Sequence, residues 1–206
     1  MENIASPHYL FAKRFLDVIF SFFSIILLIP VFLLVATMIR FDSNGSIIFC
    51  QYRCGYKGKV FKMYKFRSMV ANAPSLKRKL ESKNEAKGQM FKIKNDPRVT
   101  RVGRFIRKSS IDELPQLINV LKGDMSFVGP RPPILTEVVR YDPWHNLRLS
   151  VKPGITGLWQ TSKRNEVIFD DMVRLDLKYI RERNFWLDIK LILKTIPLLL
   201  GDKKAS

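Results

Sequence analysis

Cysteine and histidine are scarce in this chain, and the common nucleotide-binding loops are missing. Cys50 and Cys54 are its only thiols, and His8 and His145 are its only histidines. Two cysteines with no neighbouring histidine cannot complete a structural zinc site, so we expect them to be reduced and structural. No convincing Ser/His/Asp set accompanies the histidines, and His145 is interpreted as a loop or packing residue. Neither GxxxxGK[ST] nor GxGxxG occurs, so a nucleotide would have to be held by other means.

Negative charge is scarce as well. The chain has 18 Asp and Glu against 36 Lys and Arg, which gives a formal net charge of +18. Such an excess attracts anions, so the expected partner is a nucleic acid, a phosphorylated ligand or a lipid headgroup. The 206 residues are enough for one domain with a sizeable core and an appendage.

One stretch lacks charge altogether. Residues 18–39 would form a straight helix roughly 33 Å long, enough to cross the apolar core of a bilayer. Pro30 favours a kink in its middle, and Lys13, Arg14 and Arg40 favour keeping both ends on the cytoplasmic side. A helix that enters, bends at Pro30 and leaves by the same face fits both observations. A kinked spanning helix and a buried core helix stay open, whereas the length of the run argues against a secretory signal peptide.

The pattern predicts a helix-rich α/β fold in two parts: a membrane-inserted helix over residues 1–41 and a cytoplasmic catalytic domain over residues 42–206. Two short strands, 46–51 and 60–66, are expected to form a β-hairpin. Helices are predicted at 98–108, 113–122, 134–141, 166–182 and 185–200. Residues 71–95 are expected to be a loop or a solvated helix. The helix at 185–200 fits an amphipathic helix at a membrane interface, and a core-packing helix equally well.

Two adjacent carboxylates stand at the start of one predicted helix. In the motif SIDELPQ at residues 110–116, Pro115 suits a first helical turn because it has no N–H. The helix is therefore predicted to begin near Asp112. Successive helical side chains point about 100° apart, so Asp112 and Glu113 are better placed for different tasks than for sharing a proton. A capping box from Ser110 to Glu113, with a purely stabilising role, is the alternative.

Other motifs accompany this one in a fixed order. They are Lys13-Arg14 with Asp17, Phe49-x-Gln51-x-Arg53 with Gly55, residues 61–69 (FKMYKFRSM), 96–103 (DPRVTRVG), 110–126, 128–132 (VGPRP), 152–160 (KPGITGLWQ), Arg164, and Asp176-x-x-Tyr179. Together they resemble the monotopic phosphoglycosyl transferases, also called the bacterial sugar transferase family. The likeness runs nearly from end to end, and the chain resembles the minimal catalytic form.

The resemblance implies a fold and a reaction. The fold is a re-entrant helix with a small α/β domain at the cytoplasmic face of the bacterial inner membrane, in contact with anionic lipids. The reaction moves a sugar-1-phosphate from a UDP-sugar to polyprenyl (undecaprenyl) phosphate and releases UMP. It is a ping-pong reaction and the first membrane step of exopolysaccharide or glycoconjugate assembly. The sugar, the pathway and the oligomeric state stay open.

The resemblance also implies roles for single residues. Asp112 corresponds to the nucleophile that carries the phosphosugar, and Glu113 to a ligand of the essential Mg²⁺. A divalent cation is physically reasonable, because a carboxylate cannot easily approach an unscreened diphosphate. The other positions expected at the site are Lys65 and Arg131 for phosphate, Asp176 for substrate or metal, and Gln160 and Arg164 for the donor. For Lys65, Arg164 and Asp176, the alternative is an ordinary surface ion pair without a role in the reaction.

One departure and one alternative function accompany this interpretation. The family often has Ser-Pro at the kink, where this chain has Ile29-Pro30, so the carbonyl near residue 26 needs another partner.

The alternative function is a basic membrane-bound adaptor or nucleic-acid-binding module without catalysis. It explains the charge but neither the Asp112–Glu113 pair nor the Pro-Arg-Pro segment, so nucleic acid is not the expected partner.

Overall fold

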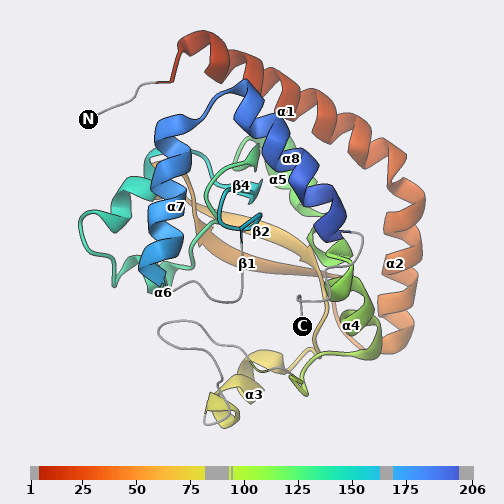
Figure 1. Cartoon of the computed structure of the whole chain (residues 1–206). Coiled ribbons are helices and arrows are strands. Elements are labelled where there is room, and N and C mark those ends of the chain that lie inside the picture. The colour runs from red at the N-terminus through yellow and green to blue at the C-terminus, as the bar shows by residue number, and fades with distance from the viewer. Residues whose placement is uncertain (1–4, 82–92, 94, 163–168, 200–206) are drawn as a thin grey trace.

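The computed structural model of the chain describes residues 5–81, 93, 95–162 and 169–199 (Figure 1). Its helices are α1 (Pro7–Leu27), α2 (Ile29–Asp42), α3 (Ala73–Lys79), α4 (Arg101–Lys108), α5 (Gln116–Lys122), α6 (Leu135–Val138), α7 (Phe169–Glu182) and α8 (Phe185–Leu199). Its strands are β1 (Ile48–Cys54), β2 (Val60–Phe66), β3 (Ser126–Val128) and β4 (Gly154–Thr156). Short 3₁₀ turns lie at Tyr56–Gly58, Ile111–Glu113 and His145–Ser150. The helix-rich α/β class predicted from the sequence is confirmed.

The N-terminal region is a bent pair of helices that arches around one side of the domain (Figure 1). The axes of α1 and α2 differ by 60°, with the break at Leu28, two residues before Pro30. Among the described helices, none has by itself the length and apolar character to cross a bilayer, whereas α1 and α2 taken together do. The predicted bend is therefore confirmed. Its re-entrant placement in a membrane stays a prediction.

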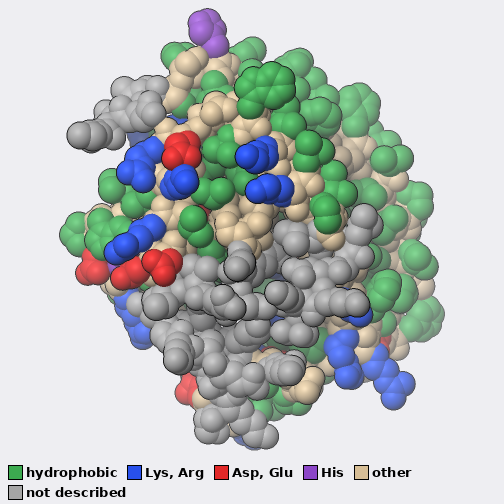
Figure 2. All heavy atoms as spheres, in the orientation of Figure 1, with side chains coloured by type: hydrophobic (Ala, Val, Ile, Leu, Met, Phe, Trp, Pro, Cys, Tyr) green, Lys and Arg blue, Asp and Glu red, His purple; other side chains and the backbone are tan. Residues whose placement is uncertain are grey.

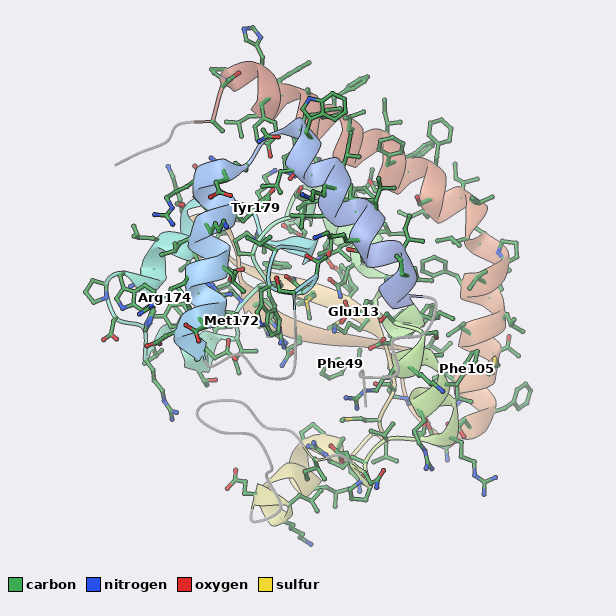
Figure 3. All side chains as sticks on the ribbon, in the orientation of Figure 1. Phe49, Phe105, Glu113, Met172, Arg174 and Tyr179 are labelled. Carbon is green, nitrogen blue, oxygen red and sulfur yellow. The ribbon has the colours of Figure 1, made fainter. Side chains whose placement is uncertain are left out.

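Large apolar side chains lie exposed along this arch, and Figure 2 shows them gathered at its outer edge. On α1 and α2 they include Phe11, Phe15, Phe23, Leu27, Leu33, Leu34 and Phe41. Helix α8 adds Trp186 and Leu193, and α4 adds Phe105, labelled in Figure 3. A contiguous apolar surface of this kind marks contact with a membrane or a protein, and so supports the membrane face expected from the sequence.

Two small sheets form the centre of the domain. Strands β1 and β2 pair antiparallel in the register Ile48↔Phe66 to Cys54↔Val60, which confirms the predicted hairpin. The first strand begins two residues later and ends three residues later than predicted. Strands β3 and β4 form a parallel pair that the sequence analysis missed. Each has only three residues, too few for an alternating pattern to stand out.

The predicted start of the helix after Asp112 is wrong. Ser110 lies in the left-handed region with φ +53° and its side chain makes no capping bond, so the alternative, a capping box from Ser110, is not found. This turn in the backbone separates α4 from the 3₁₀ turn Ile111–Glu113, and α5 begins only at Gln116. A non-glycine residue in this region carries strain that its surroundings must outweigh. Asp112 therefore sits in a tight connection rather than in a regular helix.

Helix α5 is fastened at its end to α1. Gly123, at φ +88°, closes the C-terminus of α5 in the left-handed conformation. The Arg14 guanidinium donates to the carbonyls of Val120 and Leu121 at 2.7 and 2.9 Å. A cation at a helix C-terminus also meets the negative end of the helix dipole. Helix α1 thus holds the element that follows Asp112.

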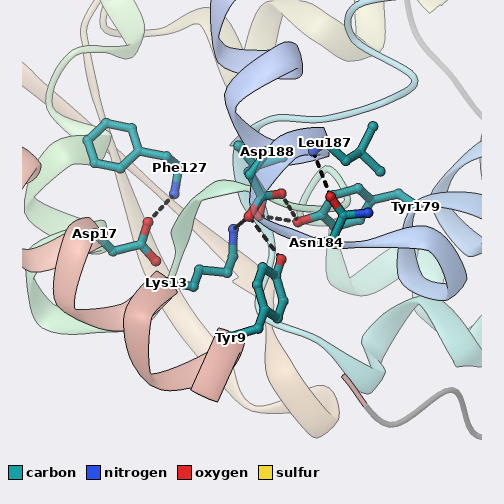
Figure 4. A network of polar contacts seen from close by, with 9 residues as sticks. Tyr9, Lys13, Asp17, Phe127, Tyr179, Asn184, Leu187 and Asp188 are labelled. Carbon is teal, nitrogen blue, oxygen red and sulfur yellow. Dashed lines mark hydrogen bonds and ion pairs between the residues drawn. The ribbon is translucent and has the colours of Figure 1, made fainter. Parts of the chain in front are cut away.

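A buried polar network joins α1 to α7 and α8 (Figure 4). One oxygen of Asp188 accepts from the Tyr9 hydroxyl at 2.9 Å and from the Lys13 ammonium at 2.6 Å. Its other oxygen accepts from the Tyr179 hydroxyl at 2.8 Å. Nearby, Asp17 accepts from the Phe127 N–H of β3 at 3.1 Å. The polar residues of the Lys-Arg-x-x-Asp motif therefore anchor α1 to the rest of the structure.

The remaining predicted helices are found, with bounds in the described part that differ from the prediction. The helices predicted at 134–141 and 166–182 are found at 135–138 and 169–182, and residues 163–168 lie outside the described part. Within 71–95 the described part contains α3. Cys50 and Cys54 are free thiols, as expected. His145 is a buried packing residue whose Nδ1 accepts from the Asp142 N–H at 3.0 Å.

Candidate active site

The two adjacent carboxylates lie in different environments. Asp112 is 9 % exposed, whereas the Glu113 side chain is 37 % exposed. Glu113 accepts a hydrogen bond from the Lys65 ammonium of β2, with 2.6 Å between Nζ and Oε1. The tight 3₁₀ turn directs consecutive side chains to different neighbours. Asp112 and Glu113 therefore have different surroundings, and their separate tasks stay a prediction.

The charge state of Asp112 is set by its surroundings. Burial raises the pKa of the Asp112 carboxyl to about 6, and the negative charge of Glu113 adds to the shift. The positive charges of Lys65 and Arg107 lower this pKa in opposition. The carboxyl is therefore mostly ionised at neutral pH although it is poorly hydrated. A poorly hydrated carboxylate is a suitable nucleophile or metal ligand.

Asn119 holds the strand that carries Lys65. It is fully buried on α5, where its Oδ1 accepts from the Tyr64 N–H at 3.0 Å and its Nδ2 donates to the Lys62 carbonyl at 2.7 Å. The side-chain amide therefore pairs with β2 much as a neighbouring strand would. Phe49 lies opposite Lys65 in the hairpin. Asn119 thus fixes the β2 backbone next to Lys65, and with it the position of Lys65 relative to Glu113.

The Pro-Arg-Pro segment leaves the end of β3 beside the hairpin. Gly129 and Gly154 let β3 and β4 approach closely, because a Cβ on Gly154 would stand 2.1 Å from the Gly129 nitrogen. Beyond them, Arg131 is exposed, with its guanidinium carbon 5.7 Å from the centre of the Trp159 ring. A planar cation above an aromatic ring is a favourable contact that keeps the guanidinium edge available for an anion.

Asp176 is found in a buried ion pair. Asp176 on α7 and Arg148 are both almost fully buried, and the Arg148 guanidinium donates to the Asp176 carboxylate. Burial raises the pKa of Asp176, and the charges of Arg148 and Arg131 act against this rise. The same guanidinium donates to the Tyr141 hydroxyl at 2.8 Å and to the Arg131 carbonyl at 3.2 Å. Asp176 therefore reaches Arg131 through Arg148.

Arg53 lies between the two halves of the site. It is buried under the Pro-Arg-Pro segment, and burial lowers the pKa of its guanidinium to about 10. The positive charge of Arg131 lowers this pKa further, whereas Glu137 and Glu113 raise it. Because these groups all act on one guanidinium, the Glu113 turn and the Arg131 segment belong to one electrostatic neighbourhood. Lys65, Arg107 and Arg53 are thus the cations whose charges act on one or other of the two carboxylates.

The structure brings most of the predicted site residues into this neighbourhood. Lys65 contacts Glu113, and Asp176 lies near Arg131 through Arg148. Gln160 is buried next to Trp159, at the Arg131 end. Arg164 lies outside the described residues.

Sequence reasoning missed Asn119 and Arg148 as parts of the site. Asn119 left a usable signal, since it is a polar residue on the apolar face of α5 between Leu117 and Val120. Arg148 left none, because its partner Asp176 is 28 residues away in the chain.

A magnesium site is compatible with the carboxylate pair. Among the described residues, no three Asp, Glu, His or Cys side chains gather into a ready-made metal site. Mg²⁺ commonly takes one or two carboxylates and completes its coordination with phosphate oxygens and water. Glu113, partly exposed beside Asp112, fits this need. Asp176 fits it less well, because Arg148 already occupies its carboxylate.

A buried carboxylate, a neighbouring acid and nearby cations make up a candidate site for a phosphate-bearing ligand. The family profile described as "Bacterial sugar transferase" matches residues 8–202. The chain therefore belongs to the bacterial sugar transferase family.

Named relatives agree with this assignment. The chain is 49 % identical over 193 residues to "Galactosyl transferase CpsE" of Streptococcus agalactiae, covering 93 % of this chain and 43 % of that protein. It is 45 % identical over 203 residues to "Undecaprenyl-phosphate galactose phosphotransferase" of Salmonella typhimurium, covering 97 % and 42 %. It is 38 % identical over 190 residues to "Exopolysaccharide production protein ExoY" of Rhizobium meliloti, covering 90 % and 84 %. The chain thus spans less than half the length of the first two relatives and most of the third.

Proposed function

We propose that this chain transfers a sugar-1-phosphate from a UDP-sugar to polyprenyl phosphate at a membrane surface. Family membership supports the general reaction, and similar proteins are named as undecaprenyl-phosphate sugar phosphotransferases. The single observation that supports the mechanism best is Asp112, a buried carboxyl with a raised pKa beside the Glu113–Lys65 ion pair. The apolar surface of α1 and α2 supports a lipid acceptor.

The proposed first half-reaction forms a covalent intermediate. An Asp112 carboxylate oxygen attacks the sugar-bearing phosphorus of the donor, and the bond from that phosphorus to the bridging oxygen breaks. UMP leaves with that oxygen, and the sugar phosphate stays on Asp112. With a pKa of about 6, the carboxyl is already ionised at pH 7 and needs no base to remove a proton.

The second half-reaction regenerates the enzyme. A phosphate oxygen of polyprenyl phosphate attacks the same phosphorus, and the Asp112 carboxylate leaves. The product is polyprenyl diphosphate sugar, so one phosphorus–oxygen bond is made and one broken in each step. The bent helices α1 and α2 would hold the domain where such an acceptor is found, on the cytoplasmic face of the inner membrane.

Cations near Asp112 make the approach of two anions feasible. A Mg²⁺ ion, when held by Glu113 and by donor phosphate oxygens, would neutralise charge that builds on the leaving UMP. Lys65 and Arg131 would share the phosphate charge from the protein side. Asp176 is assigned to holding Arg148 rather than to the metal, because its carboxylate is enclosed.

The test separates the two half-reactions. The purified protein in detergent with Mg²⁺ is mixed with UDP-galactose, UDP-glucose or UDP-N-acetylgalactosamine, with and without polyprenyl phosphate. We expect one equivalent of UMP per enzyme without acceptor, and continuous UMP release with it. Mass spectrometry of quenched enzyme should find a sugar phosphate on the peptide that contains Asp112. Asp112→Asn should abolish both signals, whereas the exposed control Asp171→Asn should leave them unchanged. Turnover by Asp112→Asn would refute the mechanism.

A further inference from the structure

Every carbonyl of the segment from Pro130 to Pro133 is held in place. Three of these four residues are prolines, which have no N–H, so their carbonyls are their only backbone hydrogen-bonding groups. Each carbonyl accepts a bond from a different donor: Pro130 from the Gly154 N–H at 2.9 Å, Arg131 from Arg148 Nη2 at 3.2 Å, Pro132 from Arg53 Nη1 at 2.9 Å, and Pro133 from the Cys54 N–H at 3.0 Å. The backbone that carries Arg131 is thus bonded to β1, to β4 and to the 3₁₀ turn at His145–Ser150.

Two of the four donors are buried arginines, which are costly to bury. Arg148 is 2 % exposed and Arg53 is 7 % exposed. Removing a charged group from water costs several kcal/mol unless its partners are well placed. Arg148 meets this requirement with Asp176 and the Tyr141 hydroxyl. Arg53 does so with Gln51 Oε1, which accepts from its Nε and Nη2 at 3.1 and 2.6 Å.

Each arginine therefore bonds both a side-chain partner and the backbone at or next to Arg131. In Arg53, Nη1 donates to the Pro132 carbonyl while Nε and Nη2 donate to Gln51. In Arg148, Nη2 donates both to the Asp176 carboxylate and to the Arg131 carbonyl. A neutral donor could satisfy a carbonyl at lower cost. The guanidinium groups of Arg148 and Arg53 satisfy these carbonyls and also add positive charge near the Arg131 guanidinium, where the donor diphosphate would bind.

We propose that Arg148 and Arg53 are positioning residues that hold the Arg131 backbone so that its guanidinium meets the donor diphosphate, with Asp176 acting through Arg148. This inference rests on the proposed function, since it concerns the UDP-sugar of that reaction. Because the segment is already fixed in the free protein, little conformational entropy is lost when the donor binds. Correct placement of Arg131 also matters for the rate, because a small misplacement of a binding group slows a reaction by a large factor.

The test is a double-mutant cycle on the donor half-reaction. Arg148→Lys keeps the charge but cannot reach the Asp176 carboxylate, the Tyr141 hydroxyl and the Arg131 carbonyl together. UMP release without acceptor is followed against donor concentration for wild type, Arg148→Lys, Arg131→Gln and the double variant. We expect Arg148→Lys to raise the half-saturating donor concentration about tenfold. In the Arg131→Gln background the same change should have less than a threefold effect, because its target is gone.

The inference is overturned if the effects of Arg148→Lys and Arg131→Gln on the half-saturating donor concentration multiply in the double variant. That result would show that Arg148 acts independently of Arg131. Arg140→Lys, an exposed arginine in the same region, is the matched control and should behave as wild type. If Arg148→Lys does not fold, Tyr141→Phe replaces it, since it removes only one acceptor of Arg148. It should raise the half-saturating concentration two- to fivefold, and again only when Arg131 is present.

Asp176→Asn distinguishes positioning from metal binding. A positioning role predicts a weaker donor interaction with an unchanged Mg²⁺ concentration for half-maximal UMP release. A marked rise in that Mg²⁺ concentration would overturn the assignment of Asp176. A wild-type protein that releases no UMP from any donor would overturn the proposed function and this inference together. A working wild type with multiplying effects would overturn this inference alone.

Discussion

Asp112→Asn is expected to stabilise the folded protein at neutral pH while it abolishes the proposed chemistry. The pKa of Asp112 lies at about 6 in the fold, raised from 3.8 mainly by burial. Between these two values the folded state binds the proton more tightly than the unfolded state does. Stability is therefore lost as the pH rises from about 4 to about 6, and the full loss is present at pH 7.

The size of this effect follows from the shift. A difference of about two pKa units corresponds to about 3 kcal/mol at pH 7. Asparagine removes the charge but buries an amide that needs hydrogen bonds, so the net gain at pH 8 is expected to be about 1–2 kcal/mol. That gain is a rise of several degrees in the melting temperature of a chain of this length. Near pH 4 the carboxyl is protonated in the fold, so about 2–3 kcal/mol of this advantage is lost and Asp112→Asn should be mildly destabilising.

Thermal unfolding in detergent at pH 4 and pH 8 measures this difference. EDTA is included because a bound divalent cation would lower the pKa of Asp112. The exposed variant Asp171→Asn serves as the control for the loss of one acidic residue. If Asp112→Asn changes the melting temperature equally at both pH values, burial does not raise the pKa of this carboxyl and our account of its reactivity is wrong.

Three further predictions concern the residues around Asp112. Lys65→Met removes a charge that lowers the pKa of Asp112, so the acid limb of single-turnover UMP release should move up by about one pH unit; an unmoved limb would contradict this. Arg14→Gln loses two bonds to the end of α5 and should cost about 2 kcal/mol in thermal unfolding, unlike Arg140→Gln. Asn119→Ala leaves an N–H and a carbonyl of β2 unpaired and should cost about 2–4 kcal/mol; a neutral result would mean that β2 does not depend on α5.

Elements with strong local patterns were predictable. The hairpin of β1 and β2 and the helices α7 and α8 follow from runs of apolar residues and from turn residues that are neighbours in the chain. The bend near Pro30 was predictable for the same reason, because proline removes a local backbone bond. The two consecutive carboxylates, Asp112 and Glu113, were visible in the sequence as part of the SIDELPQ motif.

Elements that depend on distant contacts were not predictable. Strands β3 and β4 have three residues each and pair only because Gly129 and Gly154 allow a close approach. Because Ser110 adopts a left-handed conformation, α5 begins at Gln116, four residues after the predicted start at Asp112. Serine is not a residue type that predicts this conformation. Arg148 finds Asp176 across 28 residues, a pairing that leaves no local pattern.

The sequence by itself determined the chemistry available to this protein: two adjacent carboxylates, a surplus of cations and an uncharged N-terminal stretch. Only the tertiary structure decided how that chemistry is tuned. It buried Asp112 while leaving Glu113 with Lys65, and it enclosed Asp176 with Arg148. The physical reason is that charge and helix periodicity are properties of neighbouring residues, whereas desolvation depends on everything that packs around a group.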